Sequence, residues 1–125
     1  MHVRDWLHVS DNCSALRCLL KRGIPGQAYN ISANSELVTI SVVYELYRAM
    51  RSIKCDLPWY TLKYVADRVV NDKRYGMDAV KIRALGWRPQ MFLVNGLKQT
   101  ARWYLSNLWA LENRAEMKCQ SIAVD

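Results

Sequence analysis

The sequence predicts a small α/β fold in which helices pack on short strands, and three observations support this. Apolar residues recur at helical spacing in three segments, residues 10–22, 39–50 and 93–108. Residues 26–32 instead alternate with the two-residue period of a β-strand. The 125 residues, 51% of them hydrophobic, suit one domain, and such a domain buries roughly two-thirds of the surface of its unfolded chain. The composition therefore indicates a folded lobe rather than a disordered chain.

The first helix has end signals on both sides. Ser10 or Asp11 is expected to cap its N-terminus, because both side chains can accept a hydrogen bond from a backbone N–H of the first turn. Gly23 is expected to end the helix, with Pro25 just beyond it. The strand expected at 26–32 follows directly.

A turn and a second helix come next. Residues 33–36 read ANSE, which is the composition of a turn. Thr39 is the expected N-cap of the helix that follows. The apolar stripe of this helix is formed by Ile40, Val43, Tyr44, Tyr47 and Met50.

The second half of the chain is expected to hold shorter elements before the last helix. A short apolar strand is expected at 62–66, a loop at 67–72 and an extended piece at 74–77. Asp78 can cap a brief helix that carries Ile82 and Leu85 and ends by Gly86 and Pro89. The last helix has one apolar stripe, consisting of Leu93, Leu97, Ala101, Tyr104, Leu105 and Leu108.

The chain is predicted to form one lobe over residues 1–113, followed by a polar, frayed tail at 114–125. No apolar run approaches the roughly 20 residues that span a bilayer, and the first thirty residues lack the apolar core of a signal peptide. The sequence therefore predicts a cytoplasmic protein without a membrane partner.

The formal charge of +7 raises the question of nucleic-acid binding. The 18 basic residues are scattered as short pairs, and no known nucleic-acid-binding motif accompanies them. We therefore expect a basic surface with some affinity for anions, a phosphate-bearing small ligand included, and no specific nucleic-acid partner. The four cysteines and two histidines have no metal-ligand spacing, so no metal site is expected.

The motifs of common catalytic and cofactor sites are absent from the sequence. The five glycines form no cluster between a strand and a helix, where a dinucleotide's pyrophosphate would need close access to backbone N–H groups. No Tyr is followed four residues later by Lys, and no nucleophile elbow or phosphate loop occurs. We therefore expect neither catalytic nor cofactor-binding residues in this chain.

Two arginines are candidate anion contacts. Arg4 precedes Asp5 and Trp6, and Arg68 lies in the loop expected after a strand. Two guanidinium groups from separate loops could clamp a diphosphate. The alternative is that each arginine pairs with its neighbour, Asp5 or Asp67, in a weak surface ion pair.

Three segments together resemble a known enzyme family. They read RDWLHVSDNCSALRCLLKRGIPGQAYNIS, ADRVVNDKRYGMDAVKIRALGWRPQ and GLKQTARWYLSN, and they extend from residue 4 to about residue 107. In this order and spacing they resemble the carboxy-terminal part of dTDP-glucose 4,6-dehydratase, an extended short-chain dehydrogenase. The resemblance implies the substrate-binding lobe of that family, helices on short strands, without the N-terminal Rossmann domain.

The resemblance also implies a reaction and its cofactor. The full-length family is an NAD-dependent lyase of nucleotide-sugar metabolism, which eliminates water from dTDP-glucose to give dTDP-4-keto-6-deoxyglucose. The residues that hold NAD and perform the chemistry lie in the part that this chain lacks. We therefore expect this chain alone to bind a dTDP-sugar weakly, to bind no NAD and to be inactive without a separate Rossmann-domain chain.

The resemblance points to four substrate-binding positions. Arg4 and Arg68 match family arginines that contact the diphosphate end of the substrate. Thr39 stands where the family commonly has an Asn that touches the nucleotide, and Asn71 stands in place of the His of a Pro-Gly-His turn. These departures fall in ligand-facing positions, whereas three expected packing residues are kept: Trp6, Trp87 and Trp103.

Two further hypotheses remain open beside a sugar-nucleotide-binding lobe. The chain could be an inactive remnant or a protein-interaction module that keeps the fold, or, with less support, a basic nucleic-acid-binding domain. A lobe without its dinucleotide-binding domain is also expected to expose apolar surface, which predicts aggregation or a partner.

Overall fold

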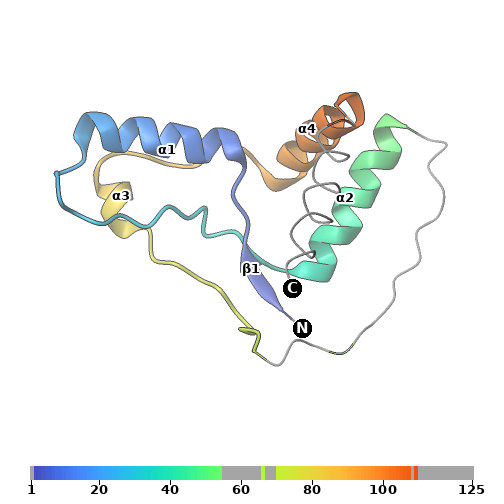
Figure 1. Cartoon of the computed structure of the whole chain (residues 1–125), viewed down its shortest axis with the longest axis horizontal. Helices are drawn as coiled ribbons and strands as arrows, with labels where there is room; N and C mark the ends of the chain where they lie inside the picture. The colour runs from blue at the N-terminus through green and yellow to red at the C-terminus, as the bar shows by residue number, and fades with distance from the viewer. Residues whose placement is uncertain (1, 55–65, 67–69, 108, 110–125) are drawn as a thin grey trace, which may run out of the picture.

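A computed structural model describes residues 2–54, 66, 70–107 and 109. The elements in chain order are β1 (Val3–Asp5), α1 (Val9–Arg22), β2 (Glu36–Val38), α2 (Thr39–Ile53), α3 (Val80–Ala84) and α4 (Leu93–Ser106). Figure 1 shows α1 and α3 on one side of β1, and α2 and α4 on the other. The predicted α/β class, helices with short strands, is confirmed.

The two strands form an antiparallel pair in which Val3 faces Val38 and Asp5 faces Glu36. A single parallel bridge adds Arg74 beside Val3, so β1 lies between β2 and the segment before α3. Three-residue strands are too short to show a two-residue period, and neither strand was expected from the sequence.

The prediction of a strand at 26–32 is wrong, because these residues form no strand in the structure. Side chains hold the segment instead: the N–H of Ile24 donates to the Tyr29 hydroxyl at 3.0 Å, and Asn30 Nδ2 donates to the carbonyl of Asp78 at 3.2 Å. The alternation arises because Tyr29 and Ile31 pack against the core from an irregular segment.

The first two helices begin close to the predicted positions, with different caps. The backbone N–H of Ser10 donates to Nδ1 of His8, the N-cap residue of α1, so neither Ser10 nor Asp11 is the cap. Gly23 ends α1 as predicted, and its N–H donates to the carbonyl of Leu19 at 2.7 Å. Thr39 is the first residue of α2 rather than its N-cap, which is Val38.

The helices of the second half of the chain lie close to their predicted positions. The brief helix expected after Asp78 is α3, but its N-cap is Ala79 rather than Asp78, whose carboxylate accepts a hydrogen bond from the N–H of Val80 at 2.8 Å. The last predicted helix is α4. In the piece expected to be extended at 74–77, only Arg74 forms a bridge. The expected strand at 62–66 and the tail at 114–125 lie outside the described residues, apart from Ala66.

The main core lies between α1 and α3. It contains Ala15, Ala79, Ile82 and Trp87, which are at most 5% exposed. Trp87 donates its indole N–H to the Ser14 hydroxyl at 2.8 Å, so this buried polar group has a partner. On the other side of β1, α2 and α4 pack against each other, and their buried side chains are Val42, Ala49 and Ala101. None of the described helices is long and apolar enough to cross a membrane.

Candidate functional site

Arg4 connects β1 to the segment at 71–75, far along the chain. Its Nη1 donates to the carbonyl of Val3 at 2.8 Å, and its Nη2 donates to the carbonyl of Asp72 at 2.9 Å. The side-chain oxygen of Asn71 lies 3.4 Å from the same Nη2. The guanidinium carbon lies 4.4 Å from the centre of the Tyr75 ring, at cation–π distance. These contacts fix the plane of the guanidinium.

Two more of the predicted residues meet at His2, just before β1. Thr39 donates both its backbone N–H and its hydroxyl to the carbonyl of His2, at 2.9 and 3.2 Å. Asn71 Nδ2 lies 3.1 Å from the Nε2 of His2. The structure therefore brings Arg4, Thr39 and Asn71 together at the start of β1, and we call this group the Arg4 cluster. Arg68 lies outside the described residues.

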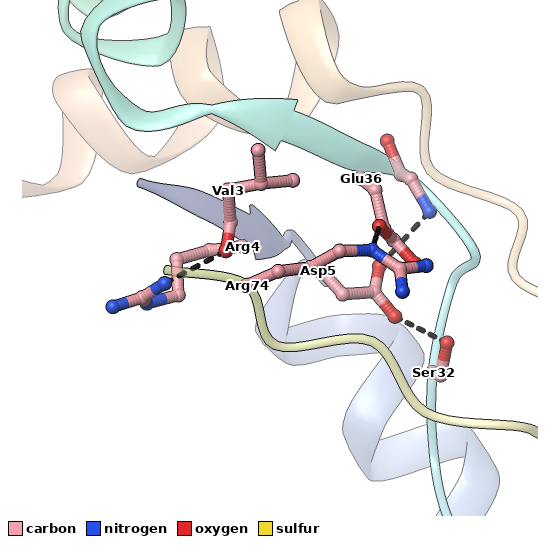
Figure 2. A network of polar contacts seen from close by, with 7 residues as sticks. Val3, Arg4, Asp5, Ser32, Glu36 and Arg74 are labelled. Carbon is pink, nitrogen blue, oxygen red and sulfur yellow. Dashed lines mark hydrogen bonds and ion pairs between the residues drawn. The ribbon is translucent and has the colours of Figure 1, made fainter. Parts of the chain in front are cut away.

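The alternative in which Arg4 pairs with Asp5 is wrong. Successive side chains of a strand point to opposite faces, and Asp5 accepts hydrogen bonds from the Ser32 hydroxyl and, at 2.9 Å, from the N–H of Ser35 (Figure 2). Ser32 is 1% exposed, so Asp5 is held by a buried partner. The charge of Arg4 has no carboxylate partner among the described residues, and this leaves the Arg4 cluster electropositive.

A bidentate ion pair holds the segment that carries Tyr75. Arg74 donates through Nε and Nη2 to the two carboxylate oxygens of Glu36 on β2, at 2.6 and 2.7 Å (Figure 2). The hydrogen bond to Glu36, and then its negative charge, raise the pKa of the Arg74 guanidinium. A Cβ at Gly76 would meet the end of the Glu36 side chain, so any other residue there would require the carboxylate to shift. The pair keeps Tyr75 beside Arg4.

The charge and the available donors of Arg4 suit the Arg4 cluster to an anion. A guanidinium has five N–H donors, and the contacts of Arg4 with Val3, Asn71 and Asp72 leave two of them available. Within the described part of the chain, no group of three His, Cys, Asp or Glu side chains could hold a metal ion.

A second feature, which sequence reasoning did not find, is an apolar groove of about 800 Å³ between the start of α1 and α4. Its aromatic and aliphatic lining includes Trp6, Leu7, Phe92, Leu97, Trp103 and Tyr104. Phe92 is 79% and Trp103 49% exposed, so Trp103 is not the packing residue that was expected. The indole N–H of Trp6 is buried and has no hydrogen-bond partner among the described residues. An unusual number of aromatic residues near the last helix was the available signal.

Comparison with known proteins confirms the resemblance found in the sequence. The chain is 40% identical over 114 residues to dTDP-glucose 4,6-dehydratase 1 of Escherichia coli, and 41% identical over 110 residues to the dTDP-glucose 4,6-dehydratase of Xanthomonas campestris. These matches cover 89% and 84% of this chain but only 32% and 31% of the relatives. No protein-family model matches the chain.

Solved structures show the same relationship. The fold matches a dTDP-glucose 4,6-dehydratase of Streptomyces venezuelae with NAD and TYD bound, with a TM-score of 0.72 and 36% identity. It matches the enzyme of Bacillus anthracis in complex with NAD with a TM-score of 0.70 and 36% identity. The matches cover 85% and 86% of this chain and 32% of each enzyme. The chain thus spans about a third of the length of the proteins it resembles.

Proposed function

We propose that this chain, which resembles the carboxy-terminal third of dTDP-glucose 4,6-dehydratases in sequence and fold, supplies one side of a binding cleft for a dTDP-sugar. The Arg4 cluster would hold the diphosphate, and Arg68 would contribute a second guanidinium. The single observation that supports this most is the convergence of Arg4, Thr39 and Asn71, three separate candidate positions, on one electropositive site.

The whole reaction would need a second component. The chemistry of the full-length relatives would require a dinucleotide-binding domain, and the sequence of this chain has no glycine cluster to hold NAD. A separate Rossmann-domain chain would supply it. The apolar groove supports such a partner, because Phe92 and Trp103 place exposed aromatic surface where another domain could bury it.

Arg4→Ala is expected to weaken binding of dTDP at least about tenfold, because a charge-assisted hydrogen bond contributes roughly 1.5–3 kcal/mol. Arg68→Ala is expected to have a similar effect. Isothermal titration with dTDP measures both. Arg4→Lys keeps the charge but loses the planar fork, so it should bind with intermediate affinity.

Arg48→Ala is the control for this titration. Arg48 is an exposed arginine of α2 whose only partner among the described residues is Glu45. Its replacement should leave dTDP affinity unchanged. If Arg48→Ala weakens binding as much as Arg4→Ala, the effect is one of net charge, and the Arg4 cluster is not the site.

The purified chain is expected to give no 4-keto-6-deoxy product from dTDP-glucose and NAD. The expectation follows from its lack of a Tyr/Lys pair and of a dinucleotide-binding glycine cluster. Product analysis by mass spectrometry tests this, with an intact dTDP-glucose 4,6-dehydratase as the positive control. Turnover by the single chain would contradict the proposal that catalysis requires another component.

The second candidate is an inactive remnant that serves as a protein-interaction module. One observation favours it: three of the five donors of Arg4 are already used by other atoms of the chain, so only Nε and one Nη1 proton remain for a ligand. The titration above separates the two candidates. No heat and no thermal shift with dTDP for the unaltered protein would favour the interaction module.

A further inference from the structure

A row of basic residues lies along α1 and the segment after α3, separate from the Arg4 cluster. We define the basic ridge as Arg17, Lys21, Arg22 and Arg88, all of which are exposed. In the sequence, Arg88 stands 66 positions after Arg22, a separation given by their residue numbers, and spacing alone therefore shows no basic patch.

The packing of α1 brings the ridge together. The Ser14 hydroxyl binds the indole N–H of Trp87 at 2.8 Å, and the Cys18 sulfur lies 3.9 Å from the carbonyl of Leu85. Residues 85–87 therefore run along this side of α1. Arg17 and Lys21 follow Ser14 and Cys18 by three positions each, so they lie on the flank of α1 that borders this segment.

The two remaining cations are held at the end of α3. Arg22 Nη1 donates to the carbonyl of Leu85 at 2.8 Å, and Arg88 Nη1 donates to the carbonyl of Arg83 at 2.7 Å. Both guanidinium groups thus bind carbonyls of the same short turn. The four cations of the basic ridge consequently border one seam between α1 and the chain that follows α3.

The charge of the ridge is uncompensated. Arg22 and Arg88 bind only neutral carbonyls, and Arg17 and Lys21 make no hydrogen bond or ion pair within the described residues. Asp11, the carboxylate in the first turn of α1, binds the backbone N–H groups of Gln90 and Met91 and, within the described part of the chain, forms no ion pair with a cation of the ridge. A positive potential therefore remains at the surface.

We propose that the basic ridge binds the phosphate backbone of nucleic acid without sequence preference. Phosphate contacts need only exposed cations, and these the ridge supplies. The residues that dominate the binding energy of protein interfaces are mostly aromatic or Arg, and Leu is under-represented among them. The exposed apolar side chains beside the ridge include Leu16 and Leu20, which are 49% and 88% exposed, whereas the aromatic Trp87 is only 5% exposed. This function is independent of dTDP-sugar binding, because the Arg4 cluster shares no residue with the ridge.

The test is a titration of a short labelled duplex DNA at salt concentrations from about 50 to about 200 mM. Four phosphate contacts should give a slope of log K against log salt of about −3.6, at roughly −0.9 for each contact. The double variant Arg17→Gln/Lys21→Gln removes two cations without breaking any described contact. It should make the slope shallower by about 2.

The matched control is Lys98→Gln/Arg102→Gln, which removes the same charge from two residues four positions apart on α4. It should leave the slope unchanged to within about 0.5, since neither residue belongs to the ridge. The proposal is overturned if the protein does not bind DNA at about 50 mM salt, or if both double variants change the slope equally. It is also overturned if polyglutamate or phosphatidylglycerol vesicles displace the DNA at a lower charge concentration than unlabelled duplex DNA does, because either result assigns the ridge to an acidic protein or a membrane.

Discussion

Asp11→Ala is expected to lower the free energy of unfolding by about 2–4 kcal/mol, because it removes two charge-assisted hydrogen bonds and leaves their donors unpaired. Asp11 is only 4% exposed. Its carboxylate accepts from the backbone N–H groups of Gln90 and Met91, at 3.0 and 2.9 Å. These bonds tie the segment before α4 to the first turn of α1. Urea denaturation followed by circular dichroism measures the change.

Asp72→Ala is the control for charge, because Asp72 is exposed and its side chain makes no hydrogen bond or ion pair within the described residues. This replacement should change the free energy of unfolding by less than about 0.5 kcal/mol. Equal destabilisation by the two replacements would show that net charge, not the link between α1 and Gln90, accounts for the loss.

Ile82→Ala is expected to cost about 2–5 kcal/mol of the free energy of unfolding, through lost burial and the cavity left behind. Ile82 is 0% exposed and is the largest of the fully buried side chains described. It lies in the core between α1 and α3, where Ala15 and Ala79 are too small to fill the space it would leave. Thermal and urea unfolding of the two proteins measure the difference.

Val80→Ala, in the same helix, provides the matched comparison. Val80 is 67% exposed, so its replacement removes aliphatic atoms that contribute little to the core. The free energy of unfolding should change by less than about 0.5 kcal/mol. A large loss at Val80 with a small loss at Ile82 would mean that α3 packs through its opposite face.

The helices could be predicted because their signals are local. The apolar spacing of α2 and α4 and the glycine after α1 act within a few residues, and the structure has these helices close to the expected positions. The N-cap of α1 was missed because His8 is an uncommon capping residue, whereas Asp11 looks like a cap but is used to hold Gln90 and Met91.

The strands and the site could not be derived from spacing in the same way. Each strand of the β1–β2 pair has only three residues, and their pairing depends on contacts between distant parts of the chain. The contact of Arg4 with Asn71 joins residues 67 positions apart, which no local pattern reveals. Arg4 was already a candidate as an arginine beside Asp5 and Trp6, whereas Thr39 and Asn71 became candidates only through the family resemblance. The apolar groove needed the structure, because exposure of Phe92 and Trp103 depends on how α4 is placed.

The central position of β1 has a consequence for the order of events during synthesis. β1 is made first, yet its partners are β2 and Arg74, and the carbonyl that receives the Arg4 guanidinium belongs to a residue 68 positions later. Such distant pairings form late, because a long loop must close before they are gained. On the ribosome, the Arg4 cluster cannot assemble until Tyr75 has emerged, so the nascent chain leaves that edge of β1 unpaired while residues 6–74 are made.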